Sequence, residues 1–182
     1  MNLNKTLITL GAFILLGATL TGCQTTTANL EKKAKQGDAQ AQYELGMAYA
    51  TSNGVPQDYK LAIKWMRSSA EQGNPKAQNA LGNVYFKGQT VPQDYQEAAK
   101  WYRLAAEQGY ASAQFNLGSC YASGSGCVLD VIQAYAWYNL AAAQGDEDAT
   151  RSRANLMKKM SRAQINAGQK LSKDYSSKYA EQ

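Results

Sequence analysis

The sequence predicts an all-α fold in which pairs of helices repeat along the chain. Four glycines, Gly37, Gly73, Gly109 and Gly145, stand 36 residues apart, and many other residues keep this period without an insertion. Within each period, two stretches with apolar residues at helical spacing flank a segment of turn-forming residues. Such self-similarity is typical of arrays in which neighbouring units bury each other's apolar faces.

Each period predicts a first helix, a turn and a second helix. In the first period these are a helix over about 39–49, the turn segment 52–58 (SNGVPQD), and a helix that Asp58 caps, that turns Trp65 inward and that ends at Gly73. The equivalent residues recur as Leu45, Leu81 and Leu117; Tyr49, Tyr85 and Tyr121; Asp58, Asp94 and Asp130; and Trp65, Trp101 and Trp137.

A glycine recurs in the middle of each first helix, at Gly46, Gly82 and Gly118. Glycine inside a helix costs about 1 kcal/mol relative to alanine. Its recurrence therefore predicts that another helix approaches closely at this point.

The two ends of the array read as caps. Residues 29–36 match half of a second helix, whereas 149–160 take the place of a fourth first helix but lack the Leu-Gly pair. Ser161 and Gln164 have the spacing of a capping box for a last helix. Residues after Asp174 are expected to fray.

The motifs A-x-x-x-L-G-x-x-Y, G-V-P-Q-D-Y, A-x-x-W and A-A-E-Q-G, at a 36-residue period, resemble the Sel-1-like repeat, a relative of the tetratricopeptide repeat. The resemblance implies an all-α, right-handed α/α superhelical solenoid whose first helices line a concave side. It divides the chain into an N-terminal half-repeat (29–36), three repeats (37–72, 73–108 and 109–144) and C-terminal capping helices with a tail (145–182).

The first 22 residues are predicted to be a signal peptide. An uncharged apolar run over 7–20 is too short for a convincing membrane span of about 20 residues. The sequence Leu20-Thr21-Gly22-Cys23 resembles the bacterial lipobox, which implies that Cys23 carries a lipid and that 23–28 form a tether. An ordinary signal peptide with a coincidental cysteine is the alternative. Gln24 after the cysteine implies the outer membrane, facing the periplasm.

The amino-acid composition argues against several classes of function. Histidine is absent, which removes the commonest general base and zinc ligand. The net charge of +5 reflects the tail, since residues 23–149 carry 10 basic and 12 acidic side chains, whereas the chain from Thr150 onward has 8 basic and 2 acidic ones. This tail is either a solvated helix face or a contact with an anionic partner. No nucleic-acid motif accompanies the basic tail, so we expect no nucleic-acid partner. We also expect no cofactor, no metal and no small-molecule substrate.

Cys120 and Cys127 fall at positions that hold small apolar residues in the other repeats. Three interpretations stay open. A disulfide is favoured in an exported protein and would contribute roughly 2.5 kcal/mol to the stability of the fold. The two cysteines could instead pack as small apolar residues, or have a redox or metal role, which two thiols without histidine support poorly.

Positions that differ between repeats while the core stays fixed are candidates for partner binding. On the first helices these include aromatic side chains suited to anchoring a peptide. The predicted partner-binding residues are Tyr43, Met47, Asn79, Asn83, Phe86, Lys87, Phe115 and Ser119.

These observations favour a membrane-anchored scaffold or adaptor of the bacterial envelope that binds another protein and is not an enzyme. The alternative is a regulator or assembly factor for cell-wall enzymes. A β-lactamase-like hydrolase, described among cysteine-rich relatives of the repeat, is a remote third possibility, because the serine signature S-x-x-K does not occur in the chain.

Overall fold

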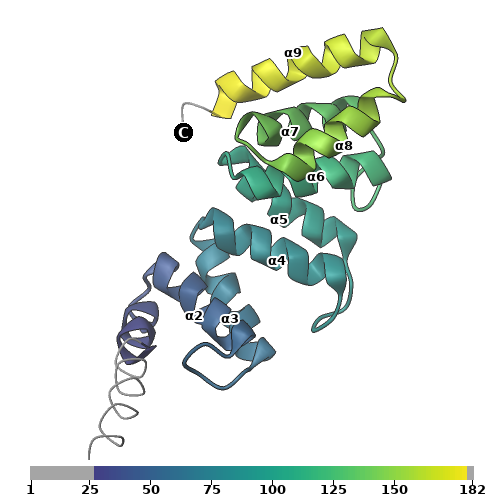
Figure 1. The fold of residues 1–182 in the computed structure, drawn as a ribbon. Helices are drawn as coiled ribbons and strands as arrows, with labels where there is room; N and C mark the ends of the chain where they lie inside the picture. Colours follow the sequence, from purple (N-terminus) through teal and green to yellow (C-terminus); the bar gives the residue numbers. More distant parts are fainter. Residues whose placement is uncertain (1–26, 180–182) are drawn as a thin grey trace, which may run out of the picture.

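The computed structural model describes residues 27–179, and within that range the chain consists of helices joined by turns and loops. A helix over 27–35 precedes the numbered elements (Figure 1). These are α2 (Ala39–Thr51), α3 (Tyr59–Glu71), α4 (Pro75–Lys87), α5 (Tyr95–Glu107), α6 (Ala111–Ser123), α7 (Val131–Ala143), α8 (Glu147–Met157) and α9 (Arg162–Tyr179).

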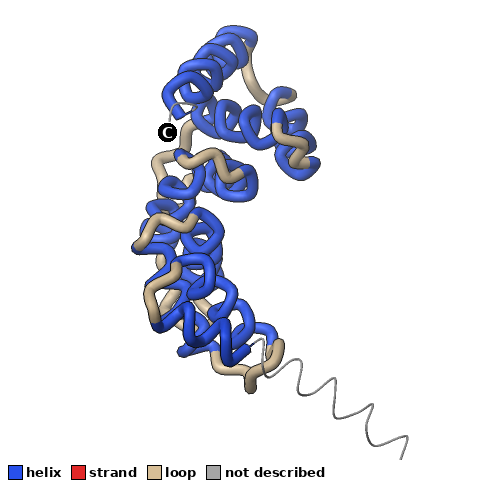
Figure 2. Tube along the Cα trace, turned by 90° about the vertical axis from the view of Figure 1, so that its left-hand side faces the viewer, coloured by secondary structure: helices blue, strands red, loops and turns tan. Residues whose placement is uncertain are grey.

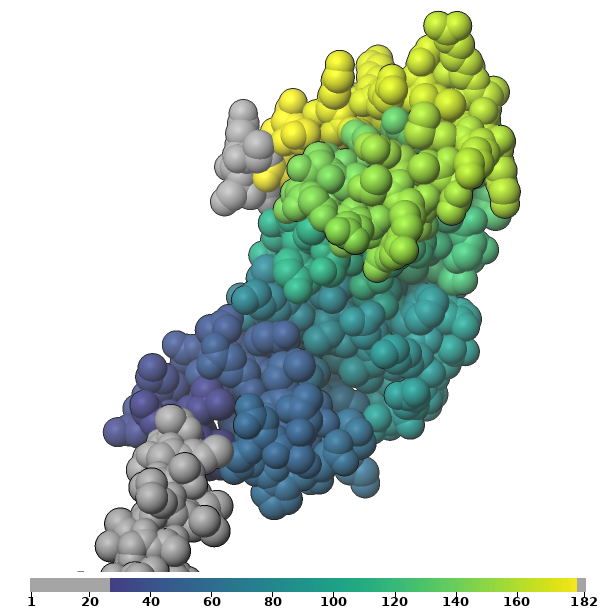
Figure 3. All heavy atoms as spheres, in the orientation of Figure 1, coloured from purple at the N-terminus to yellow at the C-terminus, as the bar shows by residue number. Residues whose placement is uncertain are grey.

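The helices form a single curved array. α2 packs against α3, α4 against α5 and α6 against α7, and each second helix also packs against the first helix of the next pair. Seen from the side, the array is an arc (Figure 2), and a space-filling view shows its units as successive layers (Figure 3). The predicted all-helical array of helix–turn–helix units is confirmed.

The core follows the repeated apolar positions. Leu45, Leu81 and Leu117 are fully buried, each between its own helix pair and a neighbour. Of the three tryptophans predicted to point inward, Trp137 is 1% exposed, whereas Trp65 and Trp101 are half-buried at the edge of the core. The prediction is thus fully correct only for Trp137, which a further helix covers.

The predicted N-caps are confirmed. Asp58, Asp94 and Asp130 have extended backbones and accept hydrogen bonds from the first free N–H groups of α3, α5 and α7. Each of these three residues also donates its own N–H to the carbonyl of the tyrosine at the end of the preceding helix, at 3.0 Å. The turn is therefore fixed at both ends, which sets the angle between the two helices of each pair.

The mid-helix glycines allow close helix contacts, as predicted. A Cβ atom at Gly82 would lie 2.5 Å from Cε1 of Tyr102, and one at Gly118 would lie 2.8 Å from Cδ1 of Tyr138. At Gly46 it would lie 2.8 Å from Cγ of Met66. A side chain at any of these positions would push the paired helices apart.

The C-terminal end departs from the repeat. α8 occupies the place of a fourth first helix, but α9 packs against α7 and makes few contacts with α8. The connection over 158–161 has four residues, whereas the turns within the three earlier helix pairs have seven. The predicted capping box is confirmed, since Ser161 and Gln164 exchange backbone-to-side-chain bonds of 2.8 and 3.2 Å.

The expectation that the chain frays after Asp174 is wrong. α9 continues to Tyr179, because two tyrosines near its end pack on the core. The rings of Tyr175 and Tyr179 stack on Trp137 at centroid distances of 4.7 and 6.0 Å. Stacked aromatic side chains bury enough area to hold the last turns in place.

Candidate partner-binding surface

The first helices, α2, α4, α6 and α8, lie along one side of the array, which we call the first-helix side. Side-chain bonds connect neighbours along it: Asn116 donates to Asn79 at 2.9 Å, and Asn74 donates to Gln40 at 3.2 Å. This side is the inside of the arc (Figures 1 and 2). Burial raises the pKa of Tyr43, and an electrostatic contact with Tyr110, two units away, raises it further.

The eight predicted binding residues differ in exposure. Met47 (36% exposed), Phe86 (38% exposed) and Lys87 are exposed. Tyr43, Asn83, Phe115 and Ser119 are half-buried, and Asn79 is 9% exposed. A partner could therefore reach the first three directly, whereas the others present only part of their side chains.

Two of the predicted binding residues also form hydrogen bonds with the second helix of their own repeat. Asn83 accepts a hydrogen bond from the hydroxyl of Tyr102 at 2.8 Å, and the Ser119 hydroxyl accepts one from Tyr138 at 3.1 Å. The equivalent pair in the first repeat is Met47 and Met66. In each repeat the two positions thus hold residues of the same kind, polar with polar or apolar with apolar.

The predicted aromatic anchors also have intramolecular contacts. Tyr43 packs against a buried cluster that contains Ala70 of its own repeat and Ala77 and Leu81 of the next repeat. Phe115 lies 5.7 Å from the ring of Tyr138. Phe115 also packs on a cluster that includes Ala149 of α8, so the partial burial of both Tyr43 and Phe115 has a structural cause.

Phe86 differs from the other two aromatic residues. Its ring meets Tyr95 edge-on at 5.1 Å and remains exposed at the end of α4. It therefore offers a supported apolar edge to solvent, next to the exposed Lys87.

A buried glutamine network escaped the sequence analysis. Gln42, Gln78 and Gln114 each donate to the carbonyl eight residues earlier, at 3.1, 3.1 and 3.2 Å. Their side-chain oxygens accept bonds of 2.7, 2.7 and 2.8 Å from the glutamines that end the following second helices, Gln72, Gln108 and Gln144. The 36-residue recurrence of these glutamines was a visible signal, but their spacing alone did not reveal the bonds.

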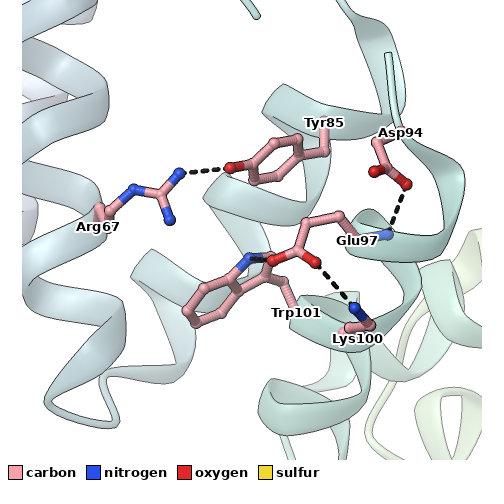
Figure 4. Close-up of polar contacts among 6 residues, drawn as sticks. All are labelled: Arg67, Tyr85, Asp94, Glu97, Lys100 and Trp101. Atoms are coloured by element: carbon pink, nitrogen blue, oxygen red, sulfur yellow. Dashed lines mark hydrogen bonds and ion pairs between the residues drawn. The ribbon is translucent and has the colours of Figure 1, made fainter. Parts of the chain in front are cut away.

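Polar contacts also join the second helix of one unit to the first helix of the next (Figure 4). The Arg67 guanidinium donates to the Tyr85 hydroxyl of the next unit. In the next pair of units, Arg103 donates to Tyr121 at 2.8 Å. Trp101 donates its indole N–H to Glu97 at 3.0 Å. In the described residues, the Trp137 N–H has no such partner.

The two cysteines share one apolar cluster. Cys120 is buried in it, and Cys127 packs on its edge, and both are free thiols in this structure. Burial raises the pKa of Cys120 to about 12. Burial also raises the pKa of Cys127, although Arg103 opposes that shift. The disulfide stays a prediction.

The proposed lipid site, Cys23, lies outside the described residues. Among residues 27–179, no cluster of histidine, cysteine or carboxylate side chains is suited to hold a metal ion. Over the same range, no helix has the length and apolar character needed to cross a membrane.

The Sel1 repeat model matches residues 39–74, 75–110 and 111–146. The chain belongs to the Sel1 repeat family. The matched repeats begin two residues later than the repeats expected from the sequence, with the same period. Sel1 repeats generally form scaffolds that bind proteins.

Solved Sel1 repeat structures resemble this chain. A Sel1 repeat protein from Oxalobacter formigenes is 38% identical, with a TM-score of 0.68, and the match covers 71% of this chain and 98% of that one. The protective antigen c5321 of uropathogenic Escherichia coli is 32% identical, with a TM-score of 0.58, covering 84% and 40%. Helicobacter pylori cysteine rich protein B is 27% identical, with a TM-score of 0.54, covering 67% and 92%. No curated protein sequence matches the chain.

Proposed function

We propose that this Sel1 repeat protein is a non-enzymatic scaffold, anchored in the bacterial envelope by a lipid on Cys23, that binds a segment of a partner protein along its first-helix side. One observation carries the binding proposal. The first helices lie side by side on the inside of the arc, and Met47, Phe86 and Lys87 are exposed on this row. Exposed aromatic and apolar groups on a rigid helical frame suit peptide anchoring.

A site-specific cross-linker tests the surface in intact cells. We expect a photoreactive residue at position 86 to capture a defined protein, whereas the same residue at position 64, exposed on the second-helix side, captures none. The substitution Phe86→Ala should abolish co-purification of that protein. Equal capture from both positions would show that the first-helix side is not the binding surface.

The anchor needs a separate experiment. Metabolic labelling with an alkyne fatty acid should label the wild-type protein and place it in the outer-membrane fraction, whereas Cys23→Ala should lose both the label and the membrane fractionation. An unlabelled wild-type protein would contradict the lipid anchor and leave the binding proposal standing.

A further inference from the structure

A cavity of about 180 Å³ lies between the first two repeats, beside the C-terminal ends of α2 and α4. Its lining is largely apolar, because α3 contributes the buried side chains of Ala62 and Met66. Ala50 of α2, Tyr59 of α3 and Val84 of α4 also line it. An engineered apolar cavity of about 150 Å³ binds a benzene molecule. This cavity therefore has room for one aromatic ring.

The second repeat places a ring of its own at the equivalent position. Phe86 follows Ala50 by one period of 36 residues and lies near the end of α4. Its ring meets the ring of Tyr95 edge-on at a centroid distance of 5.1 Å and lies 6.5 Å from the ring of Tyr102. In the first repeat, the residues equivalent to these two tyrosines both line the cavity: Tyr59 and Met66. A phenyl ring in the cavity would therefore meet the same two positions that Phe86 meets.

The backbone around Ala50 and Phe86 is held in the same way. The side-chain amide of Gln57 donates a hydrogen bond to the Ala50 carbonyl at 3.0 Å, and that of Gln93 donates to the Phe86 carbonyl at 2.9 Å. The two residues thus have the same place relative to their turns, and only the side chain differs. The methyl group of Ala50 leaves free the space that a phenyl ring would take.

The turn of the second repeat also helps to keep the cavity open. In the third repeat, Gly126 lies so close to the second repeat that a Cβ atom there would be 1.9 Å from the carbonyl oxygen of Tyr95. Thr90 is the equivalent residue one repeat earlier and carries a Cβ atom, so it cannot approach Tyr59 in this way. Gly126 also has a φ of 76°, a conformation that Thr90 does not adopt. Thr90 lines the cavity instead.

Three groups around the cavity favour an aromatic ring over an aliphatic side chain. Tyr59 can meet a ring edge-on, as Tyr95 meets Phe86. Met66 has a thioether sulfur, which makes favourable contacts with aromatic rings. Lys87 is exposed and lines the cavity, and its ammonium group is attracted to the face of a ring.

We propose that this cavity receives a phenylalanine side chain of the partner segment, in the place that Phe86 fills one repeat further along. The cavity adjoins the exposed part of the first-helix side, since Lys87, the neighbour of Phe86, lines it. This inference rests on the proposed function and adds the residue type that anchors the partner.

Nuclear magnetic resonance tests the cavity directly. The full-length protein, with isotope-labelled methionine methyl groups, is titrated in detergent with N-acetyl-phenylalaninamide. We expect the Met66 methyl signal to shift through the ring current and to saturate with a Kd of about 1–10 mM. The Met157 methyl signal should not move, and N-acetyl-alaninamide should shift neither. An unmoved Met66 signal would overturn the proposal, and so would equal affinity for N-acetyl-leucinamide.

A variant that fills the cavity tests its role in partner binding. Ala50→Phe supplies the ring from the chain itself, so it should abolish the Met66 response. It should also weaken co-purification of the protein captured at position 86 by at least about tenfold. The matched control is Gln96→Phe, which adds the same ring at an exposed site on α5 and should change neither. Undiminished co-purification with a folded Ala50→Phe protein would overturn the proposal. Ala50→Leu repeats the test should the larger side chain disturb the helical circular dichroism.

The captured segment separates this proposal from the scaffold function. Mass spectrometry of the product cross-linked at position 86 should identify a segment that contains a phenylalanine, and its change to alanine should weaken binding about tenfold. If the segment has no phenylalanine, or the alanine version binds equally, the aromatic anchor is wrong and the scaffold stands. If nothing is cross-linked at position 86, the scaffold function fails, whereas the titration still decides whether the cavity binds a ring.

Discussion

The Tyr102 hydroxyl donates a hydrogen bond to Oδ1 of Asn83 at 2.8 Å, while the ring of the same tyrosine lies against Gly82. One side chain of α5 thus fills the space over a glycine of α4 and satisfies the polar residue beside it. The same arrangement joins Tyr138 to Ser119 and Gly118 in the next repeat. In both repeats, the tyrosine of the second helix thus contacts the glycine and the adjacent polar residue of the first helix.

Gly82→Ala should destabilise the protein by about 1–3 kcal/mol, because the new methyl group would lie 2.5 Å from the Tyr102 ring. The better helix propensity of alanine offsets about 1 kcal/mol of this cost. Urea unfolding followed by circular dichroism measures the change. In a Tyr102→Ala background the space is open, so Gly82→Ala should then be neutral or stabilising. An equal cost in both backgrounds would contradict the steric explanation.

Gln78→Ala should cost about 1–3 kcal/mol, because it leaves the buried carbonyl of Ala70 and the side-chain amide of Gln108 without this partner. Thermal and urea unfolding measure the loss. Gln96→Ala, which removes an exposed glutamine of α5, is the matched control and should change stability by less than about 0.5 kcal/mol. Similar effects of the two substitutions would contradict a structural role for the buried network.

Tyr175→Ala should destabilise the C-terminal end by about 3 kcal/mol or more, because the ring stacks on Trp137 and its hydroxyl donates to Gln133 at 2.8 Å. Removing it exposes the indole, so the tryptophan emission should shift to longer wavelength in the folded protein. Tyr59→Ala, at a 51% exposed tyrosine, is the control. An unchanged emission spectrum would show that α9 does not depend on this contact.

Alkylation distinguishes the states of the two cysteines. In the reduced, folded protein at pH 8, iodoacetamide should modify Cys127 before Cys120, since Cys120 is buried and its pKa is raised to about 12. Mass spectrometry gives the order. A protein isolated without reductant that resists alkylation at both sites until reduced would establish the disulfide instead.

The same pKa shift makes stability depend on alkaline pH. The unfolded chain releases the Cys120 proton near the ordinary pKa of 9.0, whereas the folded protein keeps it until about pH 12. The native state therefore binds more protons in this window, and the free energy of unfolding falls as pH rises from about 9 to about 12, by at most about 1.4 kcal/mol per pH unit from this group. Cys120→Val should lessen the fall. An unchanged pH dependence would contradict the protonated thiol.

The sequence alone determined the helix pairs, their caps and the mid-helix contacts, because these depend on local rules that recur every 36 residues. Asp58 caps the helix that follows it, and Gly82 marks a close approach whichever unit is considered. Ser161 and Gln164 form their capping box within one turn. None of these features requires knowledge of a distant residue.

Only the tertiary structure decided how the last helix packs and which variable residues are free. α9 lies over α7, where Tyr175 stacks on Trp137, and does not pair with α8 as the repeat pattern would predict. Position 83 differs from the equivalent positions of the other repeats, yet Asn83 forms a hydrogen bond with Tyr102 on another helix. Both features depend on contacts between residues that are far apart in the sequence. The 36-residue period shows which residues recur, but it does not show which residues of different helices contact each other.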